Sequence, residues 1–426
     1  MPGENEIFTA IDMGTTKICT VVGRKLPTGT IRILGHSTVS CNAFKKGVLE
    51  NPDAAEAALK KSVSEISKST GYEIKSALVG ISGSHIQFQN RRDRLVPIDD
   101  KDLITSLDII NIPQTLIPSL NDPEREVLHS VKMHYYLDGD GAIRNPIGMH
   151  SNNIEVETQL VTGAKSIIDK IVKVVRNAKI EVGGIVLQSL ASSTSVLSKE
   201  EKEQGAILID IGAGTTDIAA FKNGSMFYTA VIPVAGYQFT NDIAFGFSTP
   251  YEHAESIKVK YASAELFPCH EDEEVELEVK GKQNTKINVK RLDICRLTRE
   301  RAQELSRLIK IKLDEANIED LQEMRLVITG GTSNLPGIRD IIQKTFGIAA
   351  RQGIPHISGI IPSELEKPPY SASVGTLLWA VTENLTNHSN GFNRFGVGQK
   401  GMLHGIATRF TNLIPMANFT LKKERI

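Results

Sequence analysis

The chain has 426 residues, 40% of them hydrophobic, and a formal net charge of −1. This length predicts two or more domains, and the near-zero charge gives no reason to expect a nucleic acid as a partner. The four cysteines lack Cys-x-x-Cys spacing, and neither a signal peptide nor an apolar run of roughly twenty residues is present, so we expect a cytoplasmic protein that is neither exported nor embedded in a membrane.

The first predicted element is a strand–turn–strand hairpin. The apolar run 7–11 leads into Asp12-Met-Gly-Thr-Thr, and β-branched and apolar residues follow. Gly14 permits close backbone approach to an anion, and the turn amides and the hydroxyls of Thr15 and Thr16 can donate hydrogen bonds to a phosphate. Because a carboxylate at a strand end can hold a hydrated magnesium ion, the hairpin predicts one wall of a phosphate site.

An insertion interrupts the alternating strands and helices that follow. Strands at 31–37 and 76–80 and an amphipathic helix at 52–69 are typical of an α/β layer. From 83 to 162 the pattern changes to alternating strands around the phrase Asn145-Pro-Ile-Gly-Met. We interpret 83–162 as an inserted subdomain.

The phosphate hairpin then occurs a second time. The apolar run 206–211 contains Asp210 and continues into a turn rich in glycine and threonine that ends at Asp217. Two such hairpins on two homologous halves predict a site that grips one nucleotide from both sides. The second set of candidate phosphate contacts is Gly212, Ala213, Gly214, Thr215 and Thr216.

A third element completes the predicted site. The apolar strand 325–329 runs into Gly330-Gly331-Thr332, and a helix is expected after Gly337. A paired glycine at a strand end lets a flat adenine and ribose lie against the backbone. The three elements together predict a nucleotide site.

The last part of the chain predicts a tethered amphipathic helix. The segment 382–401 has the polar, glycine-rich composition of a flexible linker, and a polar tail occupies 415–426. At about 100° per residue, 402–414 gathers its large apolar side chains in one arc, which suits the plane of a membrane interface. The alternative is that this helix docks on its own protein. The arc contains Met402, Leu403, Ile406, Phe410, Leu413 and Ile414.

These motifs resemble known proteins at two levels. The two hairpins and the late Gly-Gly resemble the nucleotide-binding signature of actin, sugar kinases and large heat-shock chaperones, which implies an α/β, actin-like fold with duplicated ribonuclease-H-like halves. The insertion, its Asn-Pro-Ile-Gly-Met phrase and the C-terminal amphipathic helix resemble the FtsA family of bacterial cell division proteins, from Phe8 to about Leu421. The implied domains are a first half of 1–82, 163–200 and 366–381, the FtsA-type subdomain 83–162, a second half of 201–235 and 320–365, and an outer subdomain 236–319.

The resemblance implies ATP and Mg²⁺ as ligands, with a role for each site residue. Asp12 and Asp210 would order the magnesium ion and its waters, and Lys17 would reach a β- or γ-phosphate. Gln188 would position the attacking water with help from Asp217, so at most slow ATP hydrolysis and no metabolic reaction is expected. The residues that would bound the adenosine are Gly236, Glu255, Lys258, Gly330, Gly331 and Thr332.

The resemblance also implies partners. Lys290 and Arg301, on a basic helix expected at 290–312, match the family's contacts with the acidic C-terminal peptide of the tubulin-like protein FtsZ, although the same face also suits simple solvation. The implied function is to tether FtsZ filaments to the cytoplasmic membrane at the division site, to polymerise, and to recruit later division proteins. One alternative is a PilM-like ATP-binding scaffold of type IV pilus assembly. Another, a sugar or acetate kinase, would need a substrate-binding constellation that the sequence does not contain.

Overall fold

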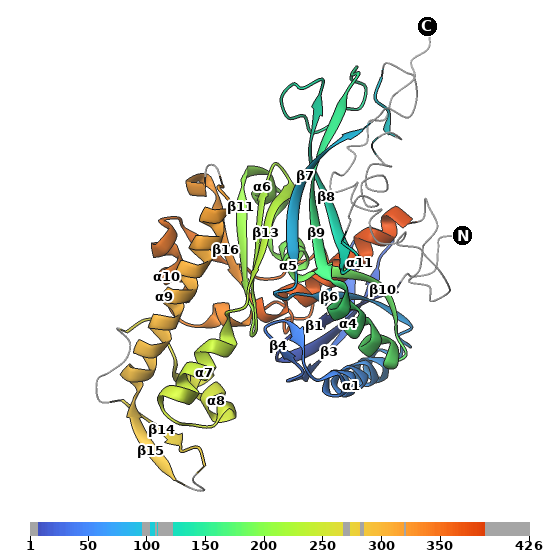
Figure 1. The fold of residues 1–426 in the computed structure, drawn as a ribbon. Coiled ribbons are helices and arrows are strands. Elements are labelled where there is room, and N and C mark those ends of the chain that lie inside the picture. The colour runs from blue at the N-terminus through green and yellow to red at the C-terminus, as the bar shows by residue number, and fades with distance from the viewer. Residues whose placement is uncertain are drawn as a thin grey trace.

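The computed structural model describes residues 7–95, 103–106, 109, 122–266, 273–281, 285–318 and 321–387. Two sheets with helices packed against them lie side by side in these residues, and a third sheet stands above them in the view of Figure 1. The predicted membrane helix 402–414, the tail 415–426 and most of the predicted linker lie outside the described residues.

The first half is a six-stranded sheet. In spatial order it contains β10 (Glu181–Leu187), β6 (Ser76–Ile81), β1 (Ile7–Met13), β2 (Lys17–Lys25), β3 (Ile31–Ser40) and β18 (Gly359–Ile360). Strands β1, β2 and β3 are antiparallel, whereas β6 and β10 run parallel to β1. Helix α1 (Pro52–Thr70) packs on this sheet; the Asn51 side chain caps its start by accepting the Ala54 amide at 3.1 Å.

The second half repeats this arrangement. In spatial order it contains β13 (Ser225–Ile232), β12 (Thr216–Lys222), β11 (Ala206–Ile211), β16 (Arg325–Thr329) and β17 (Ala350–Gln352). The first three strands are antiparallel, and β16 and β17 run parallel to β11. Order and directions match β3-β2-β1-β6-β10, which confirms the predicted duplication of ribonuclease-H-like halves.

The inserted subdomain is an antiparallel sheet that touches both halves. It consists of β7 (Gln87–Leu95), β9 (Ile154–Ala164) and β8 (Arg125–Leu137), in that spatial order. Phe88 of β7 meets Tyr228 of the second half edge-on, with 4.9 Å between ring centroids. On the other side, Nε2 of His129 accepts the amide of Leu187, the last residue of β10, at 2.9 Å. The insertion is therefore tied to the strand end that precedes Gln188.

The outer subdomain of the second half is built mainly from helices. Helix α9 (Arg291–Glu315) buries Ile294, Ala302, Leu305 and Ile309, which share one helical face. It packs with α7 (Gly236–Gly246), α8 (Tyr251–Tyr261) and the hairpin of β14 (Glu274–Glu278) and β15 (Lys286–Lys290).

The remaining elements are β4 (Phe44–Lys45), β5 (Val48–Leu49), α4 (Lys165–Asn177), α5 (Gln188–Val196), α6 (Lys199–Gln204), α10 (Ile338–Phe346), α11 (Ser371–Asn387) and the short η2 (Leu321–Glu323), η3 (Gly331–Asn334) and η4 (Pro368–Tyr370).

Two predicted boundaries near the C-terminal end are wrong. Residues 359–360, which we assigned to the second half, form β18 and pair with β3 of the first half. Gly359 can approach this edge closely because glycine has no Cβ. A Cβ at this position would lie 1.8 Å from the carbonyl oxygen of Ile31. Helix α11 continues to Asn387, so residues 382–387, predicted as linker, are helical. Neither glycine nor proline occurs between Gly375, inside the helix, and Gly391. In the part of the chain that the structure describes, none of the helices is long and apolar enough to cross a bilayer.

Candidate nucleotide site

The two predicted hairpins have the same turn geometry and lie against each other. The amide of Gly14 donates to the carbonyl of Lys17 at 3.0 Å, and the amide of Gly212 donates to the carbonyl of Thr215 at 2.9 Å. Lys17 and Thr215 therefore occupy equivalent positions. A Cβ added to Gly214 would lie 2.2 Å from the Thr15 hydroxyl. The structure thus brings the two turns, which are about two hundred residues apart, to one place.

Three buried carboxylates lie at the base of these turns, each held by hydroxyl or amide donors. Asp12 accepts the Ser373 hydroxyl at 2.7 Å and the side-chain amide of Gln188. Asp210 accepts the Ser192 hydroxyl. Asp217 accepts hydrogen bonds from Thr215, at 2.9 Å, and from Ser82. Sequence reasoning missed the three serines, although Ser192 and Ser373 lie in the small, polar stretches that begin α5 and α11.

The electrostatics of these carboxylates favour a cation between the two hairpins. Burial raises the pKa of Asp12, raises the pKa of Asp210 to about 7 and raises that of Asp217 to about 6. The charges of Asp217 and Asp12 contribute further to the shift at Asp210. A divalent ion would restore the ionised forms. Within the described ranges, no cluster of three or more His, Cys, Asp or Glu side chains that could hold a metal ion occurs.

Two residues of the hairpins make contacts other than the predicted ones: Lys17 contacts η4, although its charge also acts on Asp12 and Asp210, and Thr216 contacts the loop after β13. The ammonium of Lys17 donates to the carbonyl of Pro369 at 2.7 Å and lies 3.9 Å from the centroid of the Tyr370 ring, so it points toward η4. Burial lowers the pKa of Lys17, because the charged form is desolvated there. Thr216 is fully buried and donates its hydroxyl to the carbonyl of Val234 at 2.8 Å. Its side chain therefore fixes β12 to the following loop, away from the turn.

The predicted adenosine residues gather around the second turn. The carbonyl of Gly212 accepts the Thr332 hydroxyl at 2.7 Å and the amide of Gly236 at 3.1 Å. The ammonium of Lys258 lies 2.7 Å from the Glu255 carboxylate and 3.3 Å from the carbonyl of Gly236, so α8 is locked to the start of α7. The structure thus joins these residues, which come from three separate segments, in one cluster around Gly212.

The two glycines before η3 differ in their surroundings. Gly330 has a φ of 87°, and a Cβ there would lie 2.3 Å from Oδ1 of Asp210. A Cβ on Gly331 would meet no atom within 4 Å. Gly330 is therefore required by the fold, whereas Gly331 borders open space.

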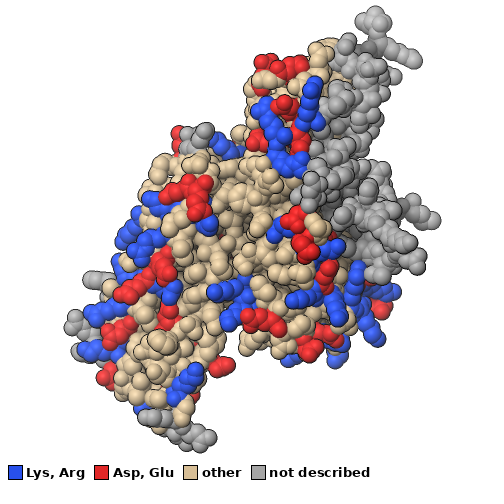
Figure 2. Space-filling model, in the orientation of Figure 1, with Lys and Arg blue, Asp and Glu red and all other residues tan. Residues whose placement is uncertain are grey.

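The predicted partner residues lie apart, one just before α9 and one within it. Lys290 is exposed, immediately before the helix. Arg301 is bound by Asp242 of α7, with a hydrogen bond of 2.8 Å, and by Glu304. The two positions are separated by about 16 Å along the helix axis. Figure 2 shows Lys and Arg interspersed with Asp and Glu along this side of the molecule, with no single basic field.

The fold and the paired hairpins define an actin-like protein, a class whose members bind nucleotides. Two family models match, "Cell division protein FtsA" over residues 207–375 and "SHS2 domain inserted in FTSA" over residues 83–162. The cell division protein FtsA of Pseudomonas aeruginosa is 33% identical over 383 residues, which cover 88% of this chain and 89% of the relative. The chain belongs to the FtsA family of cell division proteins.

Solved structures share the fold at low sequence identity. A chain of the PilM-PilN type IV pilus biogenesis complex has a TM-score of 0.63 at 14% identity, covering 88% of this chain and 98% of that chain. MreB5 of Spiroplasma citri bound to ADP has a TM-score of 0.53 at 14% identity, covering 90% and 100%. These likenesses show the fold alone, so the likeness to PilM does not favour a role in pilus assembly.

Proposed function

We propose that this chain is an ATP-binding, actin-like adaptor that tethers FtsZ filaments to the cytoplasmic membrane at the division site. The observation that carries the nucleotide part is the close approach of Gly214 to Thr15, which sets two phosphate turns against each other. A ligand that contacts both turns needs several anionic oxygens in a row, as in a triphosphate, because each turn offers backbone amides and hydroxyls. Family membership supports a nucleotide as that ligand.

Magnesium would be held between the hairpins by Asp12 and Asp210, through water. The ion supplies positive charge to the phosphate oxygens when it is bound. Gln188 already donates to Asp12 at the start of α5, so its amide is in place to orient a water molecule. Glutamine cannot take up a proton, and Asp217 is engaged with two hydroxyls, so the proposed turnover is slow.

The proposed tethering function depends on two other regions of the chain, α9 and the predicted helix 402–414. An acidic FtsZ tail peptide would bind along α9, with one carboxylate at Lys290 and one near Arg301, and an extended peptide of about five residues spans that separation. The helix 402–414 would lie in the membrane interface through its apolar arc. Filaments of this chain would present many such helices at once, which strengthens attachment by avidity. Later division proteins would then be recruited to this assembly.

A flotation experiment tests the tether. Lipid vesicles with anionic headgroups, FtsZ filaments and the full chain with ATP and Mg²⁺ are layered under a density gradient. FtsZ should rise with the vesicles only when the full chain is present. The matched control is a chain that ends at Asn387, which keeps every described element and lacks 402–414. If this shortened chain lifts FtsZ equally well, the anchor lies elsewhere and the proposal is wrong.

A further inference from the structure

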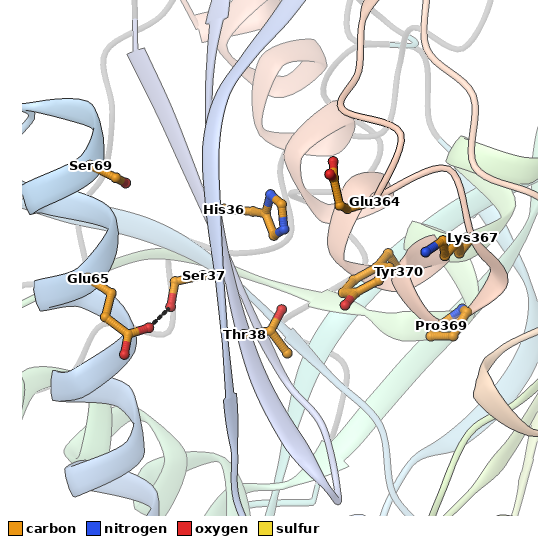
Figure 3. A pocket seen from close by; sticks show the side chains of 9 residues that line it. All are labelled: His36, Ser37, Thr38, Glu65, Ser69, Glu364, Lys367, Pro369 and Tyr370. Carbon is orange, nitrogen blue, oxygen red and sulfur yellow. Dashed lines mark hydrogen bonds between the residues drawn. The ribbon is translucent and has the colours of Figure 1, made fainter. Parts of the chain in front are cut away.

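A groove of about 640 Å³ crosses the outer edge of β3 in the first half. We call it the β3 groove. It is lined by residues 36–38 of β3, Glu65 and Ser69 of α1, and Glu364, Lys367 and Tyr370 on the other side. Figure 3 shows the strand between these two walls, with α1 on one face and the 364–370 segment on the other.

The strand edge at this groove carries no neighbouring strand. Strand β2 pairs with β3 along its whole length, but β18 pairs only with Ile31 and Arg32. From residue 33 to 40, no other strand among the described residues joins this edge. Such an edge can accept an extended peptide as an added strand, through main-chain hydrogen bonds.

The two walls receive alternate side chains of such a strand. The Ser37 hydroxyl donates to the Glu65 carboxylate at 2.7 Å, so this residue faces α1. His36 points the other way and meets the Tyr370 ring edge-on, at 6.3 Å between centroids. Because successive residues of a strand point to opposite faces, two adjacent residues of an added strand would each meet a different wall.

Each wall carries one exposed carboxylate. Glu65 lies on the α1 wall and Glu364 on the opposite wall. Burial lowers the pKa of His36, so this imidazole is neutral near pH 7 and does not offset them. Lys367 is the one ammonium among the lining residues. The lining therefore has net negative charge, and two neighbouring basic residues match its two carboxylates one for one.

We propose that the β3 groove binds an extended dibasic peptide, and that its occupant is the chain's own segment 419–426. This segment reads Phe-Thr-Leu-Lys-Lys-Glu-Arg-Ile, and it contains the adjacent pair Lys422 and Lys423 together with the strand-forming residues Phe419, Thr420 and Ile426. One lysine of the pair would face Glu65 and the other Glu364. The inference is independent of the proposed function, because it requires neither ATP nor FtsZ; the groove does border the first hairpin, since Lys17 contacts Pro369 and the ring of Tyr370 in its wall.

The segment can reach the groove. Helix α11 starts directly after η4, one wall of the groove, and its 17 residues span about 25 Å. About 30 residues separate its end from residue 419. With 402–414 as the predicted helix, about 20 Å long, the coil stretches 388–401 and 415–418 add root-mean-square spans of about 20 Å and about 11 Å. The tether therefore matches the distance back along the helix, which gives an effective concentration on the order of millimolar.

Hydrogen exchange on the full chain, without nucleotide, tests the proposal. We expect Lys422→Glu with Lys423→Glu to speed exchange roughly tenfold at every second amide of residues 36–40, those that point to the outer edge, because docking hides them for most of the time; the amides bonded to β2 should not change. Glu65→Lys with Glu364→Lys should have the same effect. Combining all four reversals should restore slow exchange, since the charges are then matched again.

A control and two adverse outcomes complete the test. Glu366→Lys alters an exposed carboxylate in the same segment that does not line the groove, and should leave exchange unchanged. Unaltered exchange in the Lys422→Glu, Lys423→Glu variant, with normal thermal unfolding, would refute the proposal. Exchange that slows only as protein concentration rises would refute it too, because the occupant would then be a second copy.

Discussion

Replacing Gly331 with valine tests where the adenosine lies. A Cβ at this position meets no atom within 4 Å, so the added side chain enters open space and disturbs no packing in the ligand-free protein. Substituting glycine also narrows the conformational freedom of the unfolded chain. We therefore expect the free energy of unfolding without ligand to stay within about 1 kcal/mol of the parent.

The effect should appear when nucleotide is added. At a ligand concentration one hundred times Kd, binding stabilises a protein by about 2.7 kcal/mol. The valine side chain would occupy the space proposed for the adenosine, so the variant should lose this stabilisation, which corresponds to a rise in Kd of about a hundredfold. Thermal unfolding with and without MgATP, together with calorimetric titration, measures both quantities.

The neighbouring glycine gives the matched control. Gly330 has a φ of 87°, and its Cβ would lie 2.3 Å from Asp210 and 2.4 Å from the carbonyl of Ile211. Gly330→Ala should therefore destabilise the protein even without ligand. If Gly331→Val keeps the full nucleotide-induced stabilisation, the adenosine does not lie beside η3 and the assignment is wrong.

Three further predictions concern the carboxylates, the partner surface and the anchor. Burial raises the pKa of Asp210 from 3.8 to about 7, so the folded ligand-free protein retains a proton that the unfolded chain has lost. The free energy of unfolding should therefore fall as the pH rises from about 4 to 7. Asp210→Asn should flatten this fall in denaturant titrations, and it should also abolish magnesium-dependent ATP binding. Lys290→Glu should weaken binding of an acidic FtsZ tail peptide about five- to a hundredfold in fluorescence anisotropy, at unchanged stability, whereas Arg301→Glu should also lower the unfolding temperature. Phe410→Asp with Leu413→Asp should remove vesicle flotation, since each buried apolar side chain contributes about 1.5 to 3 kcal/mol.

Each of these has its own control. The loss of stability in Arg301→Glu is expected because the bidentate contact with Asp242 is replaced by repulsion, so a variant with unchanged stability would contradict the observed pairing. Thr408→Asp with Asn412→Asp places the same charges on the opposite arc of the predicted helix and should retain most of the flotation. A ligand-free protein whose stability rises between pH 4.5 and 7 would contradict the sign expected for Asp210.

The sequence predicted the duplicated halves because the strand patterns and glycine turns are local features that each half carries for itself. The hydrogen bonds that hold the site together are not local. Ser373 is 361 residues from Asp12, and Arg301 is 59 residues from Asp242. From the sequence alone, a serine at a helix start or an arginine on a helix face has many equally good candidate hydrogen-bond partners. Only the packing of the sheets and helices selects one. The contact of Lys17 with Pro369, which joins residues 352 positions apart, is of the same kind.

Helix α11 connects the nucleotide site with the segment that leads to the predicted membrane helix. In its first turn Ser373 donates to Asp12 at 2.7 Å, and Ser371 lies 2.6 Å from the hydroxyl of Thr329 in the second half. From there to Asn387 the helix is about 20 Å long, and it is packed on α5 and β1. A single packed helix therefore connects a carboxylate of the candidate nucleotide site with Asn387, after which the chain leads to the predicted membrane helix.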